Sequence, residues 1–425
     1  MMKINWSGFS KKTYPERLKT LRDSDLLSQE LQENLEKNET LSVAIADQLS
    51  ENVVGTFSLP FSIVPEVIVN NQAYTVPYVT EEPSVVAAAS FACKIINRSG
   101  GFSAYVHQRL MIGQVALYQV PDREQACQEI LNQKDQLLKI ANQAYPSIVK
   151  RGGGARELRV EKVSGQTDFL VVYLHVDTQE AMGANMLNTM LEALKPHLES
   201  LSRGQSLMGI LSNYATESLV TSSCRIAFHY LSPNKDEARE LANKIVLASH
   251  FAQADPYRAA THNKGIFNGI DAFLIATGND WRAIEAGAHA YASRDGLYRG
   301  LSLWTLDSEK EELIGEMTLP MPIATKGGSI GLNPRVVLSH ELLGQPSAKD
   351  LAQIIVSMGL AQNFAALKAL VGAGIQQGHM KLQAKSLALL AGAKEAEVPK
   401  LVEGLIAEKT FNLEKAKSIL KALRS

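Results

Sequence analysis

The segment from residue 80 to residue 101 constrains the fold of this chain more than any other stretch. It begins Thr80-Glu-Glu-Pro-Ser, continues Val85-Val-Ala-Ala-Ala-Ser-Phe-Ala-Cys-Lys-Ile-Ile, and ends at Gly100-Gly101. A proline at the first helical position and glycines after the last turn are typical helix boundaries. Because small and apolar residues occupy every face, the segment predicts a buried helix.

Length and composition limit what kind of protein this is. The 425 residues are more than one hydrophobic core usually organises, so we expect two or three domains. A net charge of −1 provides no basic surplus for nucleic acid. We find neither a secretory signal nor an apolar run long enough to cross a membrane. Cys93, Cys127 and Cys224 are not spaced as metal ligands, which fits a reducing compartment. These features predict a cytoplasmic enzyme with a small-molecule substrate and no nucleic-acid, membrane or metal partner.

The pattern of elements predicts a mixed α/β (α+β) fold with an inserted domain. Residues 111–118, 123–145, 157–163, 169–176 and 180–201 read as strand, helix, strand, strand and helix. This succession indicates a small ferredoxin-like α+β domain over residues 109–219. We expect residues 1–108 and 220–375 to form a large domain built around a central buried helix, and residues 376–425 to form a helical C-terminal flap.

The inserted domain carries a possible phosphate site but no Rossmann or P-loop glycine motif. Met182-Gly-Ala-Asn185 at a helix start offers free backbone amides, and Lys150, Arg151 and Arg156 supply positive charge. Glycine turns before helices are usually structural, so this signal is weak on its own.

The stretch from Arg258 to Arg282 combines polar residues with the apolar segment 270–276, which reads as a short buried strand or helix turn. Lys264 and Asp280 lie towards its two ends. Because buried charge is costly unless paired, the two form either a structural ion pair or a catalytic one. Four further polar side chains crowd the same region and favour a site, namely His262, Asn263, Asn268 and Asn279.

Two more candidates lie elsewhere in the chain. Glu81 or Glu82, at the entrance of the buried helix, is either a helix cap or a proton donor whose pKa is raised by burial. His379 follows Gly378 and is either an ordinary surface residue or part of a flap that closes over substrate.

Several reactions are compatible with these residues. A cationic Lys264 beside a carboxylate suits the stabilisation of an oxyanion during carbonyl reduction or acyl transfer. A lyase that uses Lys264 as a Schiff-base nucleophile is equally compatible. The spacing does not decide between them.

Several motifs, in the same order along the whole chain, closely resemble the class II hydroxymethylglutaryl-coenzyme A (HMG-CoA) reductases. They are Glu51-Asn-Val-Val-Gly, Glu81-Glu-Pro-Ser-Val-Val-Ala-Ala-Ala-Ser, Ala181-Met-Gly-Ala-Asn, Asp255-Pro-Tyr-Arg-Ala-Ala-Thr-His-Asn-Lys-Gly, Ala276-Thr-Gly-Asn-Asp-Trp-Arg and Gly378-His-Met. The resemblance implies a two-step, four-electron reduction of (S)-HMG-CoA to (R)-mevalonate in the mevalonate (isoprenoid) pathway. Two reduced nicotinamides are consumed, and coenzyme A is part of the substrate and a product.

The resemblance also implies roles for four catalytic residues. Lys264 stabilises the carbonyl oxygen in both hydride transfers. Asp280 keeps Lys264 charged and couples it to Glu82, which protonates the oxygen of the aldehyde intermediate. His379, on the flap, protonates the departing coenzyme A thiolate.

Binding residues follow from the same resemblance. The substrate residues are Ser84, Asn213, Arg258 and Asn268, with Arg258 binding a carboxylate through its guanidinium fork. The cofactor residues are Tyr145, Met182, Gly183 and Asn185. The family builds its sites at a homodimer interface, so we expect a dimer or an assembly of dimers.

Three departures from the family pattern concern the cofactor and its surroundings. The usual aspartate before Ala-Met-Gly is Glu180, and the loop 326–330 reads Lys-Gly-Gly-Ser-Ile. Tyr145 stands where NADH-preferring relatives have an acidic residue. Since no carboxylate would repel a 2′-phosphate there, we expect NADPH rather than NADH.

Overall fold

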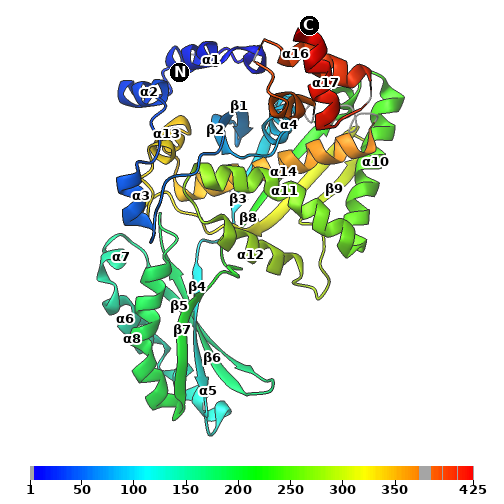
Figure 1. Cartoon of the computed structure of the whole chain (residues 1–425). Helices are drawn as coiled ribbons and strands as arrows, with labels where there is room; N and C mark the ends of the chain where they lie inside the picture. The colour runs from blue at the N-terminus through cyan, green and yellow to red at the C-terminus, as the bar shows by residue number, and fades with distance from the viewer. Residues whose placement is uncertain (1–3, 373–383, 395, 409, 425) are drawn as a thin grey trace.

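The computed structural model describes residues 4–372, 384–394, 396–408 and 410–424, and it has a mixed α/β fold with two separate sheets (Figure 1). The larger sheet has the strand order β2-β1-β3-β8-β10-β9, and the smaller sheet has the order β5-β6-β4-β7. In Figure 1 the smaller sheet and its helices extend away from the larger one. The fold class expected from the sequence is confirmed.

The six-stranded sheet begins with a hairpin, which the strand-like runs 63–69 and 74–79 around Asn70-Asn71-Gln72 predict from the sequence. Its strands are β1 (Phe61–Val69), β2 (Gln72–Val79), β3 (Phe102–Val106), β8 (Leu219–Ala227), β9 (Ser302–Asp307) and β10 (Glu312–Pro320). Asn70 and Asn71 join β1 to β2 with φ values of 50° and 66°. Positive φ at both central residues is what a tight two-residue hairpin turn requires.

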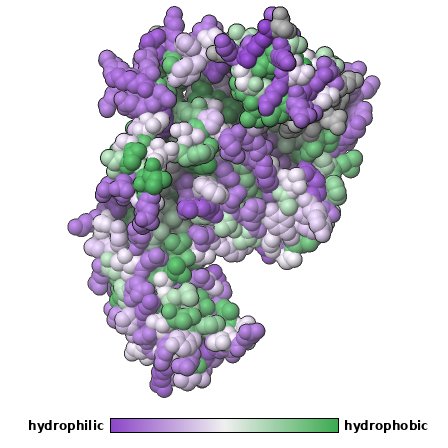
Figure 2. Space-filling model, viewed as in Figure 1, coloured by the Kyte–Doolittle hydropathy of each residue, from purple (hydrophilic) through white to green (hydrophobic). Residues whose placement is uncertain are grey.

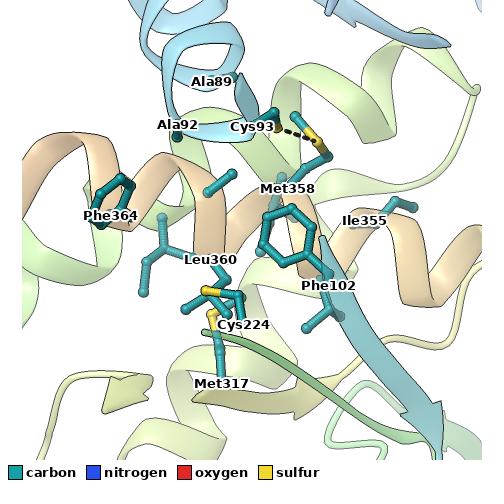
Figure 3. Close-up of a cluster of buried hydrophobic side chains, with 14 of the residues drawn as sticks. Ala89, Ala92, Cys93, Phe102, Cys224, Met317, Ile355, Met358, Leu360 and Phe364 are labelled. Carbon is teal, nitrogen blue, oxygen red and sulfur yellow. Dashed lines mark hydrogen bonds between the residues drawn. The ribbon is translucent and has the colours of Figure 1, made fainter. Parts of the chain in front are cut away.

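Helix α14 (Ala348–Val371) is the central buried helix of this part of the molecule. It packs between α4 (Val85–Arg98) and α11 (Pro256–Ala276) and contacts strands β8 and β10. Figure 3 shows Met358 and Leu360 of α14 among apolar side chains from α4 and from the sheet. One of its buried polar residues, Asn363, accepts a hydrogen bond of 2.8 Å at Oδ1 from the indole of Trp304.

The expectation that no apolar run could cross a membrane is wrong for α14 by length and composition alone. An 18-residue stretch of this helix has a mean hydropathy of 1.6, and it is the one such helix among the described residues. However, 72% of that stretch is buried inside the protein. We therefore assign α14 to the core, where an apolar surface on all sides is needed.

Two other expectations about helices need correction. Helix α4 has the predicted position, but it is not buried on every face, because Phe91 is 49% exposed. The stretch read as a short strand or helix turn belongs to α11, which is continuous over 21 residues. Ile266, Ile270 and Phe273 recur at helical spacing and form its buried face.

The four-stranded sheet has the ferredoxin-like arrangement that the sequence predicts. Its elements are β4 (Met111–Tyr118), α5 (Arg123–Asn132), α6 (Lys134–Ala144), α7 (Pro146–Lys150), β5 (Gly154–Val163), β6 (Phe169–Asp177), α8 (Ala184–Ser202) and β7 (Gln205–Ser212). All its strand pairs are antiparallel, and it has a hydrophobic core of its own. The single helix expected at 123–145 is interrupted at Gln133.

The remaining elements are helices. They are η1 (Phe9–Lys11), α1 (Tyr14–Arg22), α2 (Gln29–Glu36), α3 (Val43–Leu49), α9 (Phe228–Leu231), α10 (Lys235–Ala254), α12 (Trp281–Ala292), α13 (Pro334–Leu342), α16 (Val398–Ala407) and α17 (Leu413–Arg424). Helices α16 and α17 form a separate small apolar cluster. On the face seen in Figure 2, polar residues dominate, and apolar patches lie in both the upper and the lower parts of the molecule.

Gly101→Ala should destabilise the protein more than Gly100→Ala. Both glycines have positive φ, but a Cβ on Gly101 would lie 2.6 Å from the Ile68 carbonyl oxygen, whereas Gly100 has no atom within 4 Å. We expect a loss of about 1 kcal/mol for Gly100→Ala and about 3 kcal/mol for Gly101→Ala. Thermal unfolding of both variants checks this, and equal melting temperatures would contradict the steric argument.

Candidate active site

An ion pair between Glu82 and Lys264 is the centre of the candidate site. Lys264 Nζ donates to Glu82 Oε2 at 2.6 Å, and Asn268 Nδ2 donates to Glu82 Oε1 at 3.3 Å. Lys264 and Asn268 lie one turn apart on α11, so the two carboxylate oxygens bridge them. Glu82 therefore faces α11 and does not cap α4. The side chains of Lys264 and Glu82 remain 61% and 42% exposed, which leaves the pair accessible to a substrate.

Asp280 does not pair with Lys264 within this chain. Its Oδ1 accepts hydrogen bonds from the backbone amides of Arg282 and Ala283, at the start of α12, and from Arg282 Nε at 3.2 Å. The expected Lys–Asp pair is wrong for a single chain because α11 continues from residue 264 to residue 276. That length of helix places Lys264 about 18 Å before its end.

Three expected substrate residues lie on different elements. Arg258, in the first turn of α11, is partly buried, and burial lowers the pKa of its guanidinium. Among the described residues its guanidinium has no carboxylate partner, so it is available to an anionic ligand. Ser84 begins α4 with a φ of 76°, and its hydroxyl does not cap the helix. Asn213, after β7, is held where its carbonyl oxygen packs against Gly287 of α12.

The other polar residues of the stretch are structural. His262 Nε2 lies 2.7 Å from Ser302 Oγ, and burial lowers its pKa to about 3, so its imidazole is neutral. Asn263 bonds the backbone of Arg299 and Leu301. Asn279 bonds both backbone groups of Ala324. The sequence could not separate these residues from Lys264 and Asn268, because the whole group shares one helix and its following turn.

The sequence did not predict a half-buried pair of carboxyl groups next to the site. Asp271 lies one turn beyond Asn268 on α11 and faces Glu285 of α12. Burial, followed by the charge of Glu285, raises the pKa of Asp271 to about 8, so Asp271 is protonated at neutral pH and donates to Glu285. The spacing 264, 268, 271 along one helix face was the available signal.

The expected cofactor residues gather at one end of the four-stranded unit. Gly183 precedes α8 with a φ of 92°, and a Cβ there would lie 2.4 Å from Thr178 Cγ2. Met182 and Asn185 flank it, and Tyr145 lies between α6 and α7. This turn, which only glycine fits, lies at the start of a 19-residue helix, where free backbone amides are suited to holding a phosphate.

His379, the expected acid on the flap, lies outside the described residues. Within the ranges that the structure covers, no group of three or more His, Cys, Asp or Glu side chains could hold a metal ion.

Comparison with known proteins identifies relatives over nearly the whole chain. The family model for hydroxymethylglutaryl-coenzyme A reductase matches residues 13–384. The 3-hydroxy-3-methylglutaryl-coenzyme A reductase of Archaeoglobus fulgidus is 41% identical over 98% of this chain and 94% of its own length. A probable reductase of the same name from Borreliella burgdorferi is 33% identical over 88% of this chain and 86% of its own length.

Solved structures of the reductase from Streptococcus pneumoniae are also similar. One is 76% identical, with a TM-score of 0.87, and covers 99% of this chain and 100% of that one. A second, described as the class II enzyme bound to NADPH in open conformations, is 77% identical, with a TM-score of 0.86 over 87% of this chain and all of that one.

The fold and the Lys264–Glu82 pair, together with these relatives, define an oxidoreductase that acts on a coenzyme A thioester. The chain belongs to the hydroxymethylglutaryl-coenzyme A reductase family, and within it to class II. The resemblance read from the motifs is thereby confirmed, and the lyase alternative is not favoured.

Asp271→Asn should make the protein more resistant to alkaline pH. The folded state raises the pKa of Asp271 above its ordinary value of 3.8, so its stabilising contribution is complete below about pH 4 and is lost as pH rises through about 8. Asparagine still donates to Glu285 and does not ionise. We expect the variant to melt about 2 °C or more above the parent at pH 9, with a smaller difference at pH 5.

The exposed Asp295 supplies the control. Asp295→Asn should leave the pH dependence of the melting temperature unchanged. If Asp271→Asn shifted the melting temperature equally at pH 5 and pH 9, the shared proton would be ruled out.

Proposed function

We propose that this enzyme reduces (S)-HMG-CoA to (R)-mevalonate and free coenzyme A, with two NADPH, in the mevalonate pathway of isoprenoid synthesis. The observation that carries the proposal is the Lys264–Glu82 pair, exposed at the surface of a class II chain. The NADPH-bound structure of the 77% identical relative supports the choice of cofactor. When bound, NADPH supplies the hydride for each of the two steps.

Lys264 acts on the oxygen of the reacting carbonyl. In the first step the thioester carbon gains a hydride and its oxygen becomes negative, and the ammonium group stabilises that charge. The tetrahedral species then loses the coenzyme A thiolate, which His379 protonates, and leaves an aldehyde. In the second step the aldehyde carbon gains a hydride, and Glu82, which first takes up a proton from solvent, donates the proton that completes the alcohol. The direct hydrogen bond between Lys264 and Glu82 supports these two roles, because it holds both side chains where they can reach the same carbonyl oxygen of the substrate.

Substrate binding is assigned to side chains around this pair. Arg258 lies nearly two turns before Lys264 on α11 and would bind the free carboxylate of the hydroxymethylglutaryl group. Ser84, two residues after Glu82, has an unengaged hydroxyl for the same group. Asn268 and Asn213 would complete the site from α11 and from the loop after β7.

The nicotinamide dinucleotide is assigned to Tyr145, Met182, Gly183 and Asn185. The helix start at Gly183 suits the pyrophosphate. Lys150 and Arg151, at the end of α7, provide cations close to Tyr145 along the chain, which supports binding of a 2′-phosphate.

We assign a homodimer in which the active site lies between subunits. Within one chain Asp280 lies at the surface and is not paired with Lys264. This supports a contribution of the partner subunit to the site. Leu247, Phe251 and Tyr257, on α10 and at the start of α11, are exposed apolar side chains that an interface would cover. Higher assembly of such dimers is compatible with the same surfaces.

The domain division follows the two sheets. Residues 1–108 and 220–375 are assigned to the coenzyme A and substrate domain, 109–219 to the nucleotide-binding domain, and 376–425 to the flap. The separate apolar cores of the two sheets support the first boundary. We place the enzyme in the cytoplasm.

Lys264→Ala should abolish turnover while leaving the fold intact. Loss of a preorganised charge that stabilises an oxyanion costs about a thousandfold in rate. Turnover is measured as the loss of reduced-nicotinamide absorbance after addition of HMG-CoA. In the same assay the parent enzyme should use NADPH more efficiently than NADH. Lys244→Ala, on the surface of α10, is the matched control and should be fully active. Borohydride trapping of substrate on Lys264 without nicotinamide oxidation would overturn the reductase assignment.

His379→Ala should impair thioester reduction more than the reduction of free mevaldehyde. Mevaldehyde has no thiolate to protonate, so removal of the proposed acid should affect only the first substrate, by about a hundredfold. Steady-state rates with both substrates provide the comparison. Equal losses would show that His379 does not act on the thiolate.

A further inference from the structure

The loop before the proposed nucleotide site is fixed to the six-stranded half of the protein through Glu180. Its Oε2 accepts hydrogen bonds from Thr325 Oγ1 at 2.6 Å and from the backbone amide of Ala348 at 2.8 Å. Its carbonyl oxygen accepts another from the Thr325 amide at 2.9 Å. Ala348 is the first residue of α14, so the carboxylate lies at the positive end of the central helix.

Arg109 holds the same loop from the other side. Its Nε donates to the Gln179 carbonyl oxygen at 2.8 Å, and its Nη2 donates to those of Ala181 at 3.1 Å and Ile323 at 2.6 Å. The guanidinium is mostly buried. Burial lowers its pKa, while the charge of Glu180 raises it. The guanidinium of Arg109 thus bonds the residue before Glu180, the residue after it, and Ile323 in the segment that follows β10.

Residues 178–183, which connect these bonds to the proposed nucleotide site, form a short loop with hydrogen-bonded and packing contacts of its own. Thr178 Oγ1 donates to the Ala181 carbonyl oxygen at 2.6 Å, and Gly183 packs directly on Thr178. A displacement at Glu180 would therefore be transmitted to the start of α8. On the other side, α14 packs against α11, which carries Lys264.

We infer that Glu180 and Arg109 are positioning residues that fix the nucleotide-binding loop relative to the helix that carries Lys264. The inference rests on the proposed nucleotide site at residues 182–185. It explains why the loop needs a side chain long enough to reach both Thr325 and α14. A hydride acceptor and donor must meet within about 3.5 Å, so the distance between the two halves of the protein has to be held.

The experiment compares the binding of NADPH and HMG-CoA to Glu180 variants. Glu180→Ala should weaken NADPH binding about tenfold, the loss expected for a charged hydrogen-bonded anchor, and change the KM for HMG-CoA less than about twofold. Glu180→Gln should stay within about threefold of the parent for NADPH, because its amide oxygen accepts both bonds. The Kd for NADPH is measured by reduced-nicotinamide fluorescence, and Glu192→Ala, on the surface of α8, is the control.

Each outcome decides the inference. Equal losses for NADPH and HMG-CoA, or a lower melting temperature with unchanged NADPH affinity, would show an ordinary structural role and overturn it. If Glu180→Ala does not fold, Thr325→Val removes one of the two side-chain bonds and should weaken NADPH binding about threefold. An unchanged Kd in that variant would equally overturn the inference.

Gly183→Ala separates this inference from the proposed cofactor site. A methyl group there would collide with Thr178 and should abolish measurable NADPH binding if the site is correct. Normal NADPH binding by Gly183→Ala would refute the site itself. Weak binding by Gly183→Ala with normal binding by Glu180→Ala would refute only the positioning role.

Discussion

Burial of α14 is the constraint on which the rest of the structure depends. A helix with apolar residues all round its surface must be enclosed, and α4, α11 and the six-stranded sheet supply the enclosure. Lys264 lies on one of these helices, and Glu82 lies immediately before another. The 2.6 Å contact between them is therefore set by packing against a shared core. Lys264 is thereby held on a rigid helix, whereas Glu82 lies in the short bend between β2 and α4.

Much of the architecture could be predicted from local patterns. The α4 boundaries, the Asn70-Asn71 hairpin and the ferredoxin-like succession follow from proline and glycine positions and from alternating hydrophobicity. The continuous helix α11 was not predicted, because its polar residues interrupt the apolar pattern. Those residues are polar for different reasons. His262 and Asn263 satisfy buried partners, whereas Lys264 and Asn268 face Glu82.

The candidate site was recognised from motifs, and its geometry required the structure. Motif order identified Glu82 and Lys264, but spacing alone left a structural ion pair, a Schiff base and an oxyanion site equally open. The Asp271–Glu285 pair is visible only once α11 and α12 are placed side by side. The bonds of Glu180 are likewise long-range, since Ala348 lies 168 residues further along the chain. No local pattern encodes a contact of that kind.

The path of the chain between β3 and β8 has a consequence for the order of folding. Glu82 and Lys264 are separated by 182 residues, and the entire four-stranded unit lies between them. The chain enters that unit after β3 and returns from it into β8, and these two strands are antiparallel neighbours. The amides of His107 and Leu110 donate to the carbonyl oxygens of Leu219 and Glu217. Its ends are thus close together, so once it has folded it acts as a short connection and lowers the entropy cost of closing the long loop. Folding of the inserted unit before the rest would therefore bring Glu82 and Lys264 together at a smaller entropy cost.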